Sequence, residues 1–132
     1  DKLPFPAKFK LMPGYVFRQN NPAVCGIEVQ LGTLKPGARL MNKDGLPLGN
    51  VKGMQKEQEN VEAAERNDQV ACSMTDITIG RQVQEGDILF TYVEEKDFLA
   101  LKDLKDQLRQ DEKDVLREIS VIMRVKNPVW GV

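Results

Sequence analysis

The sequence of 132 residues contains no histidine, and aromatic residues make up only 6% of it. Without imidazole, Ser-His-Asp and Cys-His catalysis and every metal site that needs a histidine ligand are excluded. The 19 lysine and arginine residues nearly balance the 20 aspartate and glutamate residues, so the net charge is only -1. A chain with this balance lacks the positive charge that holds long nucleic acid through many phosphate contacts. These absences argue against an enzyme.

Cysteine and long apolar runs are also scarce. Cys25 and Cys72 form no Cys-x-x-Cys pair, so we predict buried thiols that act as small hydrophobic groups, with no metal and no redox site. No segment approaches the roughly 20 apolar residues of a membrane helix, and no signal peptide opens the chain, so we expect a cytoplasmic protein without a membrane partner. The start at Asp1, without methionine, leads us to expect a piece of a longer protein.

The chain changes character near Tyr92. Before that point glycine and proline separate short segments, whereas after Glu94 neither residue occurs until Pro128. We therefore predict an all-β part over 1–93 and a helical part over 94–132. Many short strands at this spacing are typical of a closed barrel or a sandwich. The predicted strands cover Ala7–Leu11, Tyr15–Arg18, Val24–Gln30, Arg39–Asn42, Gly49–Met54, Asn60–Ala63, Gln69–Met74 and Asp87–Val93.

The helical part predicts two amphipathic helices packed against each other and on the β part. The first runs from Glu95 to about Gln110, with Phe98, Leu101, Leu104 and Leu108 on one face. We predict Asp111 as the N-cap of the second helix, with Asp114 as a weak capping-box acid. The second helix places Val115, Ile119 and Ile122 on one stripe, with Leu116 and Met123 beside it. With both helices packed, no apolar stripe remains free, so we expect a monomer.

No motif for nucleotide or calcium binding is present. Gly45 and Gly49 bracket a short loop, but the sequence contains no phosphate-binding loop, no dinucleotide fingerprint and no calcium loop. Glu57, Glu59, Glu62 and Glu65 are interspersed with other polar residues and are expected on solvated faces. A small carboxylate-dependent enzyme remains the alternative from a different class. We predict no catalytic residue, no cofactor and no metal ligand in this chain.

Several motifs of the β part occur together in one known family. They are Tyr15-Val16-Phe17-Arg18, the segment from Ala23 to Gly37 that ends in Lys35-Pro36-Gly37, Val51-Lys52-Gly53-Met54-Gln55, and Val83-Gln84-Glu85-Gly86-Asp87-Ile88-Leu89. They resemble the second-domain barrel of translational GTPases. The opening from Pro6 to Gly14, the paired helices and the close at Asn127-Pro128-Val129-Trp130-Gly131-Val132 are more specific. Over essentially the whole chain they resemble the C-terminal domain (domain IV) of archaeal and eukaryotic initiation factor 5B, with the archaeal branch the better match.

The resemblance implies a non-catalytic part of a translation initiation GTPase that acts in ribosomal subunit joining. Its implied partners are initiator methionyl-tRNA, initiation factor 1A and the ribosome. GTP and magnesium would be bound by a GTPase domain that this chain does not contain. If the barrel is only a scaffold, a pure protein-partner adaptor is the alternative.

The resemblance also implies a site for the methionyl-CCA end of the tRNA on one barrel face, at Arg18, Gly26, Ile27, Cys72 and Ser73. Gly26 would let the ligand approach the backbone closely, and Arg18 would contact a phosphate or stack on a base. The bacterial cysteine on the first of these strands aligns with Ile27, which suits an unformylated methionine. From the residues alone, Gly26 is equally compatible with a bulge, and Cys72 and Ser73 with ordinary strand positions.

The helices are implied to form a groove for the tail of initiation factor 1A, which carries apolar residues among acids. An apolar groove with a basic rim suits such a peptide, although the same residues also suit an ordinary helix-pair core. Trp130 would cap the barrel–helix junction or line the groove. The predicted groove residues are Leu101, Leu104, Leu108, Val115, Ile119 and Ile122, with Lys102, Lys105, Arg117 and Arg124 on the rim.

Overall fold

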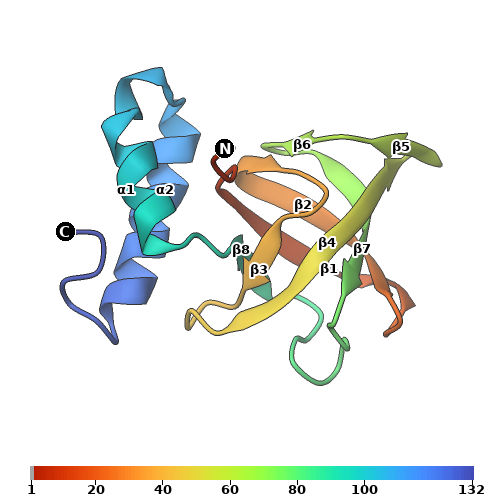
Figure 1. Ribbon diagram of the computed structural model, residues 1–132. Coiled ribbons are helices and arrows are strands. Elements are labelled where there is room, and N and C mark those ends of the chain that lie inside the picture. Colours follow the sequence, from red (N-terminus) through yellow and green to blue (C-terminus); the bar gives the residue numbers. More distant parts are fainter. Residues whose placement is uncertain (1) are drawn as a thin grey trace.

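The first two-thirds of the chain form β-strands and the last third forms helices, as a computed structural model that describes residues 2–132 shows (Figure 1). The change from strand to helix falls where glycine and proline give way to an uninterrupted run of helix-forming residues. The strands are β1 (Ala7–Arg18), β2 (Ala23–Leu34), β3 (Arg39–Met41), β4 (Pro47–Lys56), β5 (Glu59–Val61), β6 (Ala64–Glu65), β7 (Gln69–Thr75) and β8 (Ile88–Thr91).

Six of these strands close into an antiparallel barrel in the order β1-β8-β3-β4-β7-β2, and β2 pairs with β1 to complete the ring. The short strands β5 and β6 add to β4 and β2. Closure leaves no free edge along the main strands, so the barrel prediction is confirmed over the sandwich. Alternate residues of β2 and β7 point inward, which places Cys25, Ile27 and Cys72 in the core with no exposed surface.

Strand β1 departs from the prediction of two separate strands, Ala7–Leu11 and Tyr15–Arg18. It continues from Ala7 to Arg18 and bulges instead of turning. Leu11 pairs with Ile27 and Val16 pairs with Cys25, so the four residues 12–15 lie opposite Gly26 alone. The backbone of Gly14 has a φ of 82°, a conformation that glycine adopts without strain, which lets the strand continue past the bulge.

The helical part consists of α1 (Glu95–Asp103), the 3₁₀ turn η1 (Lys105–Gln107) and α2 (Gln110–Arg124). The prediction of one helix from Glu95 to Gln110 is therefore too long. Asp103 and Asp106 place negative charge where the dipole of α1 is already negative, which disfavours continuation of the helix. The chain tightens at η1 and becomes extended at Leu108, which allows α2 to return alongside α1 (Figure 1).

The prediction of Asp111 as the N-cap of α2 is wrong. The N-cap is Arg109, and its N–H donates to the Glu112 carboxylate at 2.9 Å. Asp111 lies in the first turn, where its carboxylate accepts the Gly32 N–H of β2 at 3.0 Å. Because this buried carboxylate accepts a hydrogen bond from the barrel, it is not available to cap its own helix.

Helix α2 lies against β2 and β1, and a second apolar core fills the junction. Three polar contacts reinforce it: Asp111 with Gly32, Arg109 Nη2 with Thr33 Oγ1 at 3.0 Å, and Lys8 Nζ with Glu118 Oε1 at 2.8 Å. Trp130 packs on Phe98 with ring centroids 4.7 Å apart and is 6% exposed. The junction core comprises Met41, Phe90, Val93, Phe98, Leu101, Val115, Leu116, Ile119 and Trp130.

Candidate functional sites on the barrel and the helices

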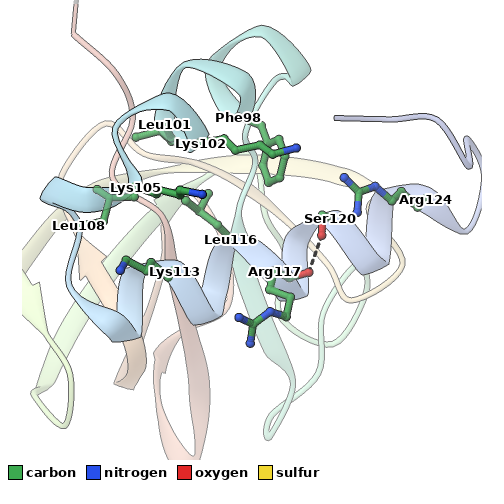
Figure 2. A pocket seen from close by; sticks show the side chains of 10 residues that line it. All are labelled: Phe98, Leu101, Lys102, Lys105, Leu108, Lys113, Leu116, Arg117, Ser120 and Arg124. Carbon is green, nitrogen blue, oxygen red and sulfur yellow. Dashed lines mark hydrogen bonds between the residues drawn. The ribbon is translucent and has the colours of Figure 1, made fainter. Parts of the chain in front are cut away.

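A cavity of about 310 Å³ opens between α1 and α2, and we call it the helix groove. Figure 2 shows its floor of apolar side chains from both helices, with basic side chains around the opening. The lining contains five cations and no carboxylate. Its residues are Phe98, Leu101, Lys102, Lys105, Leu108, Lys113, Leu116, Arg117, Ser120 and Arg124.

The cations of the helix groove are mostly without acidic partners. Among residues 2–132, only Arg117 of the five has a carboxylate within 4.0 Å, that of Asp114 at 3.8 Å. Arg124 Nε donates to the Trp130 carbonyl at 2.6 Å, and Lys102 Nζ donates to the Gly131 carbonyl at 3.4 Å. These two contacts tie the C-terminal segment to the helices without neutralising the charge. The groove therefore presents an apolar floor under a positive rim.

The structure brings only part of the predicted groove together. Leu101, Leu108, Lys105 and Arg117 line it, as do Lys102 and Arg124. Leu104 lies outside the lining and is 39% exposed, because the chain has left α1 by that point.

The predicted stripe of α2, which comprises Val115, Ile119 and Ile122, faces the barrel and does not line the groove. Val115 and Ile119 have no exposed surface and pack into the junction core, and Ile122 packs against the same core, close to Gly45. An amphipathic helix buries its most apolar stripe first, and the barrel takes that stripe from α2. Leu116 and Ser120, one position further along the helix, line the groove instead.

Two adjoining hollows mark the outside of the barrel, and we call this region the barrel face. They measure about 300 Å³ and about 230 Å³ and share Gln55 and Ala71. The larger is lined by Met12, Tyr15, Phe17, Gly26, Gln55, Lys56, Glu57, Gln58, Gln69, Val70 and Ala71. The smaller is lined by Val24, Gly53, Met54, Gln55, Asn60, Ala71 and Ser73.

Strand alternation divides the residues predicted to bind the tRNA end. Gly26 lines the larger hollow and Ser73 the smaller, whereas Ile27 and Cys72 point into the barrel with no exposed surface. Arg18 is exposed but lies outside both linings, and its Nε donates to the Asn20 carbonyl at 3.0 Å. The side chains of Ile27 and Cys72 are therefore shielded from any ligand on this face.

The two thiols are directly opposite each other on β2 and β7 inside the barrel. Burial, with a smaller contribution from the charge of Glu85, raises the pKa of Cys25 to about 11. Burial also raises the pKa of Cys72 far above its ordinary value. Both residues are protonated hydrophobic groups of the core at neutral pH.

Gly26 lies opposite the bulge of β1, which is one of the two alternatives that the sequence left open for it. The space above it is occupied by this chain: a Cβ at Gly26 would lie 3.0 Å from Tyr15 Cβ and 3.8 Å from Met12 Sδ. The glycine therefore makes room for the bulge of β1, and Tyr15 covers it. The sequence analysis missed Tyr15 and Phe17 as site residues, although their alternation about the inward-facing Val16 was the available signal.

Two kinds of feature are absent from the described part of the chain. Within residues 2–132 no cluster of acidic or thiol groups could hold a metal ion. Over the same range no helix has the length and apolarity needed to cross a membrane. The predicted solvated carboxylates Glu57, Glu59, Glu62 and Glu65 are all exposed.

Comparison with known proteins gives one consistent family. Residues 5–90 match the family model described as elongation factor Tu domain 4. A probable translation initiation factor IF-2 from Methanopyrus kandleri is 41% identical over 100% of this chain, and one from Metallosphaera sedula is 40% identical over the same share. The chain spans 22% of the length of each of these relatives.

A solved structure agrees with the sequence relatives. The crystal structure of GDP-bound aIF5B from Aeropyrum pernix superposes on 98% of this chain with a TM-score of 0.92 and 39% identity, and the match covers 22% of that protein. The likeness extends over the barrel and both helices together. The chain belongs to the elongation factor Tu domain 4 family and is a domain of a translation initiation factor of the IF-2/aIF5B kind.

Proposed function

We propose that this domain works through two separate surfaces during ribosomal subunit joining. The helix groove docks the tail of initiation factor 1A, and the barrel face recognises the methionyl-CCA end of initiator tRNA. In this proposal the barrel is of the kind found in the second domain of translational GTPases, and GTP and magnesium are bound elsewhere in the whole factor. The domain acts as a monomer in the cytoplasm, alongside the ribosome.

The observation that carries the groove proposal is the combination of an apolar floor with five cations and no carboxylate. A peptide with alternating apolar and acidic residues complements both features, since its apolar side chains fill the floor and its carboxylates reach the rim. Lys105 comes from the turn η1 and Lys113 from α2 (Figure 2), so such a peptide would be held by cations from separate elements of the helical part.

The barrel face supports a ligand of lower charge. Its larger hollow contains one lysine and one glutamate among glutamine and apolar side chains. An aminoacyl ester with its terminal adenosine needs apolar surface and hydrogen-bonding groups more than charge. We expect weak affinity in isolation, with the rest of the factor and the ribosome supplying local concentration.

Chemical-shift titration of the labelled domain tests both surfaces. A methionyl minihelix with a CCA end should shift the backbone signals of Gly26, Gln55 and Ser73, and the uncharged minihelix should shift them less. An acidic-apolar tail peptide should shift Leu116, Ser120 and Lys105 instead. Equal and negligible shifts with both minihelices would contradict tRNA recognition by the barrel face. The second candidate, a pure protein-partner adaptor, would then remain, and it is favoured by the concentration of cations at the helix groove rather than at the barrel face.

A further inference from the structure

Two aromatic side chains are exposed next to each other on the barrel face. Tyr15 is 52% exposed and Phe17 is 65% exposed, and both line the larger hollow. The other aromatic residues are buried or paired: Lys35 lies over the ring of Phe5 at 3.8 Å, and Arg39 lies over that of Tyr92 at 4.6 Å. Among residues 2–132, neither ring of the Tyr15–Phe17 pair has an aromatic or cationic partner.

The backbone holds these rings outward. Val16, between them, packs against the barrel core and pairs with Cys25, so its two neighbours must point to the opposite side. The Gly14 N–H donates to the Glu85 carboxylate at 2.7 Å, which ties the preceding bulge to the loop before β8. Gly26 lies directly beneath Tyr15, and a Cβ added there would lie 3.0 Å from Tyr15 Cβ and 3.5 Å from its Cγ, so Tyr15 would have to shift.

The surroundings of the rings suit a flat heterocycle with polar edges. Three amide side chains, Gln55, Gln58 and Gln69, line the same hollow. Amides both donate and accept hydrogen bonds, as the edges of nucleobases require. Lys56 is the only cation of the lining, and a carboxylate oxygen of Asp68 lies 3.9 Å from its Nζ. With so little free charge, contacts to phosphates would contribute little binding energy here.

We propose that Tyr15 and Phe17 form a stacking platform for unpaired nucleobases, and that Gly26 is a positioning residue that sets the ring of Tyr15. Stacking of bases on exposed aromatic side chains binds single strands without requiring a large positive charge. The proposal rests on the proposed tRNA function and deepens it: the platform takes the unpaired bases of the CCA end, and the smaller hollow beside Ser73 is left for the methionyl group.

The test uses the whole 132-residue domain and a minihelix with 2-aminopurine at its terminal adenosine. Stacking on the platform should quench the fluorescence of 2-aminopurine. Tyr15→Ala and Phe17→Ala should each weaken binding of the minihelix by about 5- to 100-fold and relieve the quenching. Tyr15→Phe keeps a ring and should bind within about twofold of the parent domain. Phe5→Ala removes an exposed ring outside the barrel face and serves as the matched control.

Gly26→Ala tests the positioning role. The added methyl group should displace Tyr15 and reduce quenching at saturating minihelix, while unfolding remains cooperative. The combined variant Gly26→Ala with Tyr15→Ala should then bind no more weakly than Tyr15→Ala alone. Additive losses would show that Gly26 acts independently of Tyr15, which would overturn its positioning role.

Three further outcomes separate this proposal from the function on which it rests. If the methionyl minihelix binds and both alanine variants bind it equally well, the platform is wrong and the tRNA function stands. If quenching depends on the two rings but charged and uncharged minihelices bind alike, the platform stands and methionyl recognition fails. If a minihelix lacking the three unpaired nucleotides binds as well as the complete one, the occupant is not a nucleobase and the platform is overturned.

Discussion

The barrel face and the helix groove differ in how their residues come to be exposed. Along a regular strand of the barrel, successive side chains point to opposite faces, so knowing that Cys25 faces inward fixes Gly26 outward. In α2, several stripes lie around one cylinder, and only packing against the barrel decides which is buried. The comparison teaches that the outward face of a strand can be predicted from one residue known to point inward. The exposed face of a helix can be predicted only when the element that packs against it is known.

The largest effect should come from the buried stripe of α2. Ile119→Ala removes a side chain with no exposed surface from the junction core and should lower the free energy of unfolding by about 2–5 kcal/mol. Val121→Ala, at a position on the same helix that is 62% exposed, should change it by less than about 0.5 kcal/mol. Urea denaturation measures both. Similar values for the two variants would mean that the helix is turned differently in solution.

The polar part of the junction should come next. Asp111→Ala leaves the Gly32 N–H without its acceptor and Arg109 without its closest carboxylate. We expect a loss of about 2–3 kcal/mol in the free energy of unfolding. Asp114→Ala, which removes only exposed contacts to Gln110 and Arg117, is the control and should cost much less.

The same contact predicts a pH dependence. Burial by itself would raise the pKa of Asp111, but hydrogen bonds from Arg109 and the Gly32 N–H lower it below its ordinary value. The stabilisation is therefore complete above the unfolded-state pKa, near pH 4, and disappears as the pH falls through the lower folded-state value. Asp111→Ala should flatten the stability profile below about pH 5. If the variant lost the same free energy of unfolding at every pH, the pH dependence would not come from Asp111.

A change on the inward face of the barrel should have a smaller but measurable effect. Cys72→Ser places a hydroxyl in an apolar interior and should cost about 1–3 kcal/mol. Ser73→Ala, one residue away on the outward face, should leave stability within about 0.5 kcal/mol of the parent. Thermal unfolding of the two variants compares adjacent residues of one strand. An equal loss of stability in the two variants would contradict the assignment of Cys72 to the interior and Ser73 to the outer face of the barrel.

The smallest effect concerns the rim of the helix groove. Lys105→Glu should weaken an acidic-apolar peptide by about tenfold, roughly 1.4 kcal/mol, and reduce the dependence of binding on salt. Lys126→Glu reverses an exposed charge outside the lining and should have little effect. Calorimetry at two salt concentrations gives both quantities. If the two reversals weaken the peptide equally, the groove binds through net charge alone.

Much of the architecture could be foreseen from the order of residues. The closed barrel is confirmed, and the last strand ends at Thr91 and the first helix begins at Glu95, because glycine and proline spacing and apolar alternation are local signals. The continuous β1 could not be foreseen, because Pro13-Gly14 has the composition of a turn. Pairing with β2 before and after this point, Leu11 with Ile27 and Val16 with Cys25, holds the two halves of the strand in one sheet.

The residues of the two sites also differ in whether local sequence alone could predict their positions. Alternation alone could have shown that Gly26 and Ser73 face the outside of the barrel while Ile27 and Cys72 face its interior, since one inward residue on each strand settles its neighbours. Three features depend on contacts between residues far apart in the chain. They are the hydrogen bond from the Gly32 N–H of β2 to Asp111, the burial of Val115 and Ile119 against the barrel, and the position of Tyr15 above Gly26. Local sequence sets the periodicity of each element, but the free energy of burial and hydrogen bonding at the junction chooses which face is left for a partner.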